Sequence, residues 1–181
     1  MKTKTTVMFL SAAASLAVAG GITLAQQRGQ DRYTLKVPGG LAFSDFRGYD
    51  KWEDVAVSET KGSVKAILGN PTAIRAYKEG VPDNGGSFPE GTKMVKIEWI
   101  KKMNPVSPYF VEIPETLKTL SFIEKDSKRF PSTHGWAFAQ FAYDPKTRTL
   151  KPSVTGPECG YACHASHVAS RDYIFTAYPP R

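Results

Sequence analysis

The sequence predicts a mainly β protein of the α+β class, with an antiparallel β-sheet and a few short helices. Short segments rich in β-branched and aromatic residues alternate with turns that contain Gly, Pro or Asp. The 13 prolines and 15 glycines are spread along the chain, which argues against a helical bundle. The expected strands are residues 55–58, 63–68, 92–100, 117–124, 136–143 and 172–177.

Two helical segments interrupt this pattern. Asn70 is a good N-cap residue, Pro71 suits a first helical turn, and Gly80 can end the helix. A second helical turn is expected over residues 158–168, close to the C-terminal end. The predicted sheet therefore carries one helix in its first half and one near its end.

Residues 1–25 have the pattern of a cleaved export signal. Lys2 and Lys4 give a short positive start, an apolar run follows over residues 7–19, and small residues follow at 23–25. The apolar run is only weakly hydrophobic, so an uncleaved membrane anchor is the less favoured alternative. We therefore expect a periplasmic protein.

The sequence after the expected signal, residues 26–181, predicts one domain. Residues 26–44 are expected to form a polar leader, and residues 45–181 a single domain long enough to bury a sizeable core. The formal net charge of +7 becomes +5 without Lys2 and Lys4, and basic residues are interspersed with acidic ones, as in 124–129. This charge pattern favours a solvated surface. Nucleic acid is excluded as a partner because an exported protein rarely meets it, whereas a mildly basic surface is compatible with steering an acidic redox partner.

Both cysteines lie in one short segment, Cys159-Gly-Tyr-Ala-Cys163-His164. Two thiols followed at once by a histidine are typical of covalent haem attachment, with the histidine as the iron ligand. The usual spacing has two residues between the cysteines, whereas this chain has three. A local Cys159–Cys163 disulfide, with His164 in solvent, is the alternative, and a reduced pair is the least compatible with export.

Helical geometry can accommodate the longer spacing. Residues four apart lie on one helix face much as residues three apart do, so both thiols can point at one group. Gly160 is expected to adopt a left-handed conformation and to absorb the extra residue as a bulge. His167, one turn beyond His164, would lie on the same side of a haem.

An attachment motif near the C-terminus of a strand-rich chain fits neither class I cytochromes c nor the four-helix cytochromes c-prime. The chain instead resembles the cytochrome P-460 family and its relative cytochrome c-prime-beta. The resemblance rests on the order of several segments: SVKAILGNP (63–71), AYKEG (76–80), FPEGTKMVKIE (88–98), DSKRF (126–130), GWAFAQF (135–141), the cysteine motif and DYIFTAY (172–178).

The resemblance implies an antiparallel β fold that carries one covalent haem c on a C-terminal helical turn. It implies binding of small nitrogen oxides, or oxidation of hydroxylamine, with electrons passed to an exported acceptor. A gas-binding or electron-transfer module of c-prime-beta type is the second hypothesis. A haem-free, disulfide-stapled β domain that binds another ligand is the third. A homodimer is compatible with each of them.

The resemblance also assigns residues. Cys159 and Cys163 would attach the haem, and Lys96 occupies the position of the lysine that P-460 proteins cross-link to it. Alternation places Lys96 on one strand face with Met94 and Glu98, which is equally typical of a solvated face. Phe88 would cap the haem, although core packing is the simpler role.

Weaker candidates complete the expected site. Lys65 lies where the family places a pocket arginine, and Ser121 lies near the place of its distal acid, which puts proton transfer in doubt. Met94 and Met103 are candidate sixth ligands but are more typical of a core. His134 is expected to be a loop residue.

Overall fold

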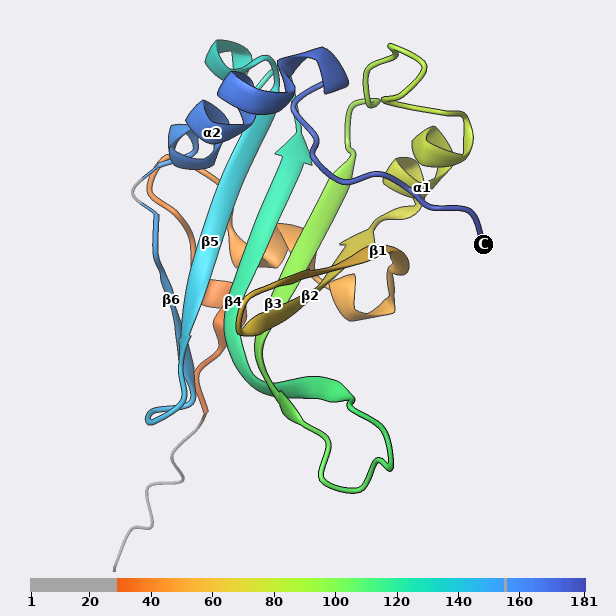
Figure 1. Ribbon diagram of the computed structural model, residues 1–181. Helices are drawn as coiled ribbons and strands as arrows, with labels where there is room; N and C mark the ends of the chain where they lie inside the picture. Colours follow the sequence, from red (N-terminus) through yellow and green to blue (C-terminus); the bar gives the residue numbers. More distant parts are fainter. Residues whose placement is uncertain (1–28, 155) are drawn as a thin grey trace, which may run out of the picture.

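The computed structural model describes residues 29–154 and 156–181 and confirms the mainly β fold (Figure 1). Six antiparallel strands form one sheet in chain order. Its strands are β1 (Glu53–Thr60), β2 (Ser63–Gly69), β3 (Lys93–Met103), β4 (Glu112–Lys125), β5 (Trp136–Asp144) and β6 (Thr149–Pro152). The helices are η1 (Arg32–Thr34), η2 (Phe43–Phe46), η3 (Tyr49–Lys51), α1 (Pro71–Lys78), η4 (Pro131–Thr133), α2 (Glu158–Val168) and η5 (Ala169–Arg171).

Five of the six expected strands are present, and the sixth prediction is wrong. Residues 172–177 form no strand, because Asp172 and Tyr173 both have left-handed backbones and the segment then runs irregularly across the end of the sheet. Strand β6 was not expected, since its four residues are too few to give a periodic signal.

Both helices lie where the sequence predicts them. The side chain of Asn70 accepts a hydrogen bond from the backbone N–H of Ala73, and Gly80 has a left-handed φ of 92° just beyond α1. α2 spans the expected residues 158–168. No helix in the described parts of the chain has the length and apolar character needed to span a membrane.

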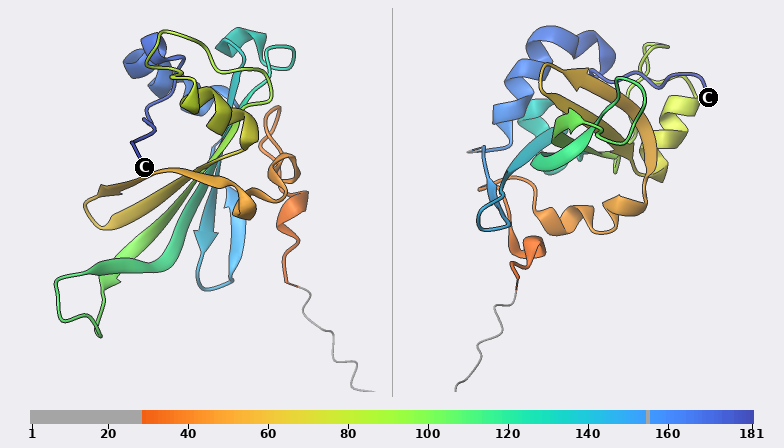
Figure 2. Two further views of the ribbon diagram at one scale, coloured as in Figure 1. Left: turned by 90° about the vertical axis from the view of Figure 1, so that its right-hand side faces the viewer. Right: turned by 60° about the horizontal axis from the view of Figure 1, so that its bottom comes forward.

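The sheet buries a hydrophobic cluster on each face. On one face the N-terminal segment packs against the central strands, where the ring of Phe46 stacks on Phe122 with centroids 4.4 Å apart. On the other face, α1 and the C-terminal segment pack near one end of the strands, and α2 lies against β5 (Figure 2). Side chains alternate along each strand, so Val95 and Phe122 face the first cluster while Met94 faces the second.

The expected polar leader, residues 26–44, requires a correction over the part that the structure describes. Val37, Leu41 and Phe43 are fully buried in the first cluster, and Lys36 forms an isolated β-bridge with Ala42. The segment is part of the core, because it covers a sheet face that would otherwise leave aromatic side chains in water. The predicted export signal, residues 1–25, lies outside the described residues.

Candidate functional site

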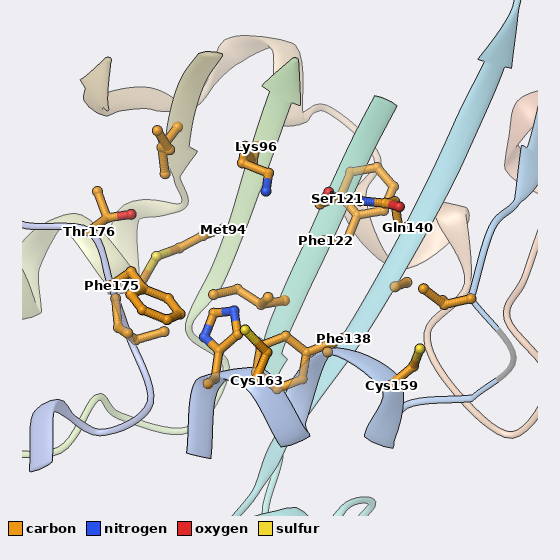
Figure 3. Close-up of a pocket in the computed structure, with 17 residues that line it drawn as sticks. Met94, Lys96, Ser121, Phe122, Phe138, Gln140, Cys159, Cys163, Phe175 and Thr176 are labelled. Atoms are coloured by element: carbon orange, nitrogen blue, oxygen red, sulfur yellow. Dashed lines mark hydrogen bonds between the residues drawn. The ribbon is translucent and has the colours of Figure 1, made fainter. Parts of the chain in front are cut away.

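A cavity of about 400 Å³ lies between the second face of the sheet and α2 (Figure 3). Its sheet side is built from two rows of cross-strand neighbours. The first row runs through Ile67, Lys96, Ser121 and Gln140 on β2 to β5, and the second through Met94, Ile123 and Phe138 on β3 to β5. The first row is mainly polar and the second is apolar, so the cavity is chemically two-sided.

α2 forms the opposite wall with Cys159, Gly160, Cys163 and His164. Both cysteines are exposed free thiols, and both are directed toward the cavity (Figure 3). The expected bulge at Gly160 is wrong: this residue lies inside a regular α-helix and has no positive φ. The three-residue spacing is therefore accommodated by the helix itself.

Gly160 has a different role, which concerns packing. A Cβ atom at this position would lie 2.6 Å from the Cβ of Phe138 on β5, closer than such atoms approach in proteins. Phe138 is 5% exposed and is held by its neighbours in the sheet. The absence of a side chain at Gly160 therefore lets α2 lie directly on β5.

The imidazole of His164 is half-buried and oriented by its surroundings. Its Nδ1 lies 2.5 Å from the backbone carbonyl oxygen of Tyr173, and because a carbonyl only accepts, Nδ1 carries the proton. The ring lies between Phe138 and Phe175, with centroid distances of 4.5 and 4.8 Å. Burial lowers the pKa of His164, which keeps the ring neutral and leaves Nε2 as the nitrogen that can bind a metal.

Lys96 enters the cavity from the sheet side. Its amine points toward the space between β3 and the helix, beside Ser121 on the neighbouring strand (Figure 3). Burial is the main cause that lowers the pKa of Lys96; Glu98 opposes the shift, and the nearby charges of Lys65 and Lys118 add to it. A lysine with a lowered pKa is more often neutral and is then a nucleophile or a proton acceptor.

A hydrogen-bonded chain that includes Gln140 borders the same cavity, and sequence reasoning missed this residue. Gln140 Nε2 donates to Ser121 Oγ at 3.2 Å, and Ser153 Oγ donates to Gln140 Oε1 at 3.1 Å. Because Ser121 Oγ is the acceptor in this chain, its own hydroxyl proton remains available to a molecule in the cavity or to Lys96. The signal that could have found Gln140 is alternation along β5, which places it on the same face as Phe138.

The structure places Phe88 elsewhere. Its ring is 2% exposed, packs edge-on against Tyr77 and Trp136, and is not part of the cavity lining in the described chain. Met94 does line the cavity, and its sulfur accepts a hydrogen bond from the Tyr77 hydroxyl at 3.5 Å. Met103 lies at the distant end of β3 and is exposed.

The remaining candidates lie outside the cavity lining. Lys65 donates a hydrogen bond to Thr60. His134 has a left-handed backbone after η4, and its Nδ1 lies 2.5 Å from the Tyr161 hydroxyl. His167 is exposed, and its Nδ1 bonds to a backbone carbonyl one turn earlier in α2.

The cavity residues fit a covalently held haem. Cys159 and Cys163 offer two free thiols on one helix face, and His164 presents an imidazole whose Nδ1 proton is already bound. Sulfur and neutral imidazole are suitable partners of a porphyrin and its iron, and the apolar row suits a flat hydrophobic macrocycle.

A strand-rich fold with such a cavity between its sheet and a short C-terminal helix has the features of a β-sheet cytochrome. The comparison with protein families agrees: the family model Cytochrome P460 matches residues 46–176. The chain therefore belongs to the cytochrome P460 family and is a haem- and iron-binding protein. No curated protein matches it.

We expect Gly160→Ala to destabilise the protein, although alanine in a helix is usually favoured over glycine by about 1 kcal/mol. The added methyl group conflicts with Phe138, and overpacking of this kind costs about 1–3 kcal/mol. Urea denaturation measures the free energy of unfolding. In a Phe138→Gly background both the Cβ atom and the ring are gone, so the same substitution should become neutral or stabilising; equal destabilisation in both backgrounds would contradict the packing role.

Proposed function

We propose that the chain is an exported mono-haem c-type cytochrome of P-460 type that oxidises hydroxylamine or binds small nitrogen oxides. Electrons would pass to an exported acceptor. The observation that carries the proposal is one cavity that holds Cys159, Cys163 and His164 on its helix wall and Lys96 on its sheet wall. Lys96 comes from the segment 88–98 on β3 and the other three from the cysteine motif on α2, yet all four face the same space.

In this proposal the two thiols would hold the haem as thioethers, and His164 Nε2 would bind its iron. The haem iron, when bound, supplies the one-electron redox chemistry. The hydrogen bond from His164 Nδ1 to the Tyr173 carbonyl fixes the tautomer and the ring plane. The chain itself orients the cofactor and surrounds it with an apolar wall.

The sheet side of the cavity supplies the groups that would handle protons. Oxidation of hydroxylamine releases protons together with electrons, so a proton acceptor near the substrate is needed. Lys96, with its lowered pKa, and the Ser121 hydroxyl beside it are the polar groups positioned for this task. By resemblance, Lys96 is also the residue that would be cross-linked to the haem.

A specific observation favours a second candidate function. The described cavity lining contains no Asp or Glu, and Ser121 lies near the place where the family carries an acid. A site without that acid is suited to binding a small gas molecule or to electron transfer, as in cytochrome c-prime-beta. The cross-link at Lys96 decides between the two functions.

Covalent attachment can be tested on the two cysteines separately. Expressed in a host that matures c-type cytochromes, the wild type should gain the mass of one haem. Cys159→Ala should retain it through Cys163, which directly precedes His164, whereas Cys163→Ala should retain less. Intact mass spectrometry measures all three. A double cysteine variant that still carries the added mass would contradict attachment at these thiols.

His164→Ala should abolish the native haem spectrum and lower stability, because the iron bond contributes free energy to the folded state. A loss of ~2 kcal/mol corresponds to a fall in Tm of roughly 4–8 °C for a chain of this size. His167→Ala is the matched control, since His167 lies one turn further along α2 and outside the cavity lining. Equal spectra and Tm values for both variants would exclude His164 as the axial ligand.

Lys96→Leu should leave the fold and the thioether-bound haem intact, remove hydroxylamine oxidation, and give an ordinary c-type absorption spectrum. The reason is that leucine fills similar space but cannot form the cross-link or accept a proton. Lys65→Leu is the control on the same sheet face, one cross-strand row away. If the wild type already has an ordinary c-type spectrum that Lys96→Leu does not alter, the gas-binding function is the correct one.

A further inference from the structure

Asp172 carries a buried carboxylate with three hydrogen-bond donors. Lys125 Nζ donates to Oδ1 at 2.9 Å, Trp136 Nε1 donates to the same oxygen at 3.3 Å, and the backbone N–H of Phe88 donates to Oδ2 at 2.7 Å. The side chains of Asp172 and Lys125 are 7% and 9% exposed. Burial of an ion pair costs desolvation free energy. A buried carboxylate that nevertheless has all three donors in place indicates that this part of the fold has a specific structural demand for it.

The demand arises from the backbone at this point. Asp172 and Tyr173 have φ values of 46° and 64°, two consecutive left-handed residues that are not glycine. Such conformations are unfavourable for residues with a Cβ and persist where surrounding contacts impose them. The carboxylate of Asp172 ties this turn to the ends of β4 and β5 through Lys125 and Trp136, which are themselves cross-strand partners.

The turn determines where the carbonyl of Tyr173 points. The backbone N–H of Tyr173 donates a hydrogen bond to the Val168 carbonyl at the end of α2. The carbonyl oxygen of Tyr173 accepts a hydrogen bond from His164 Nδ1. The next residues, Ile174 and Phe175, then line the cavity, and the Phe175 ring packs against His164. The carboxylate of Asp172 therefore holds a segment that contacts the imidazole of His164 twice, through the Tyr173 carbonyl and through the Phe175 ring.

We propose that Asp172 is a positioning residue for the axial imidazole, acting through the Tyr173 carbonyl that it holds against His164 Nδ1. This inference rests on the proposed role of His164. A firmly held acceptor increases electron donation from the imidazole to the iron and thereby stabilises the oxidised state. The chain thus tunes its haem from a residue that does not contact the cofactor cavity.

Asp172→Asn is the direct test. The amide keeps the size of the side chain but replaces one acceptor oxygen by a donor, which must face Lys125, Trp136 or the Phe88 N–H. The turn should loosen, so the midpoint potential should rise and the iron–histidine stretching frequency of the reduced protein should fall. Glu124→Gln is the matched control: its carboxylate is also 7% exposed, but its ion pairs in the described chain are with Lys93 and Arg129 and not with the turn at Asp172.

The outcomes separate the two proposals. A fall in Tm in both variants, with the potential and the stretching frequency unchanged in Asp172→Asn, would show a purely structural role and overturn the inference. Lys125→Gln, which keeps a donor, should shift both readouts in the same direction by a smaller amount and serves if Asp172→Asn does not fold. If the wild type binds no haem, the proposed function fails, and ¹⁵N NMR still decides whether His164 loses its Nδ1–H tautomer in the variants.

Discussion

The direct contact between α2 and β5 is the constraint on which the cavity depends. Helix and sheet are normally separated by two layers of side chains, but Gly160 contributes none, so α2 lies on the ring of Phe138. This close approach brings Cys163 and His164 over the sheet face and sets the width of the space between them and Lys96. A cofactor of fixed thickness requires such a fixed separation, and close packing provides it.

The two rows of the sheet give this space its chemistry. Alternation along each strand would ordinarily fill this face with apolar side chains, as the row through Met94 and Ile123 does. The neighbouring row carries Lys96, Ser121 and Gln140 instead, and the latter two satisfy each other by a hydrogen bond. Polar groups on a partly buried face reduce stability unless they are paired, and Ser121 and Gln140 meet this condition.

Local patterns were sufficient to predict both α-helices and five strands, because capping residues and alternation act over a few positions. The cavity residues Cys159, Cys163, His164 and Lys96 could be named for the same reason, with help from the family resemblance. Long-range packing determined what was missed. The left-handed turn at Asp172 depends on donors from β4, β5 and the Phe88 loop, and the close packing at Gly160 depends on Phe138. Neither partner is adjacent in sequence.

The longer cysteine spacing follows from the same helix geometry. At about 100° per residue, side chains three apart diverge by ~60° around the axis, whereas side chains four apart diverge by only ~40°. Cys159 and Cys163 therefore share a face at least as well as the usual pair, and the added residue lengthens their separation along the axis by about 1.5 Å. His164 keeps its ordinary place directly after the second cysteine. In the proposed haem site the extra residue would change where Cys159 reaches the cofactor edge, while the position of His164 directly after Cys163 is that of the usual motif.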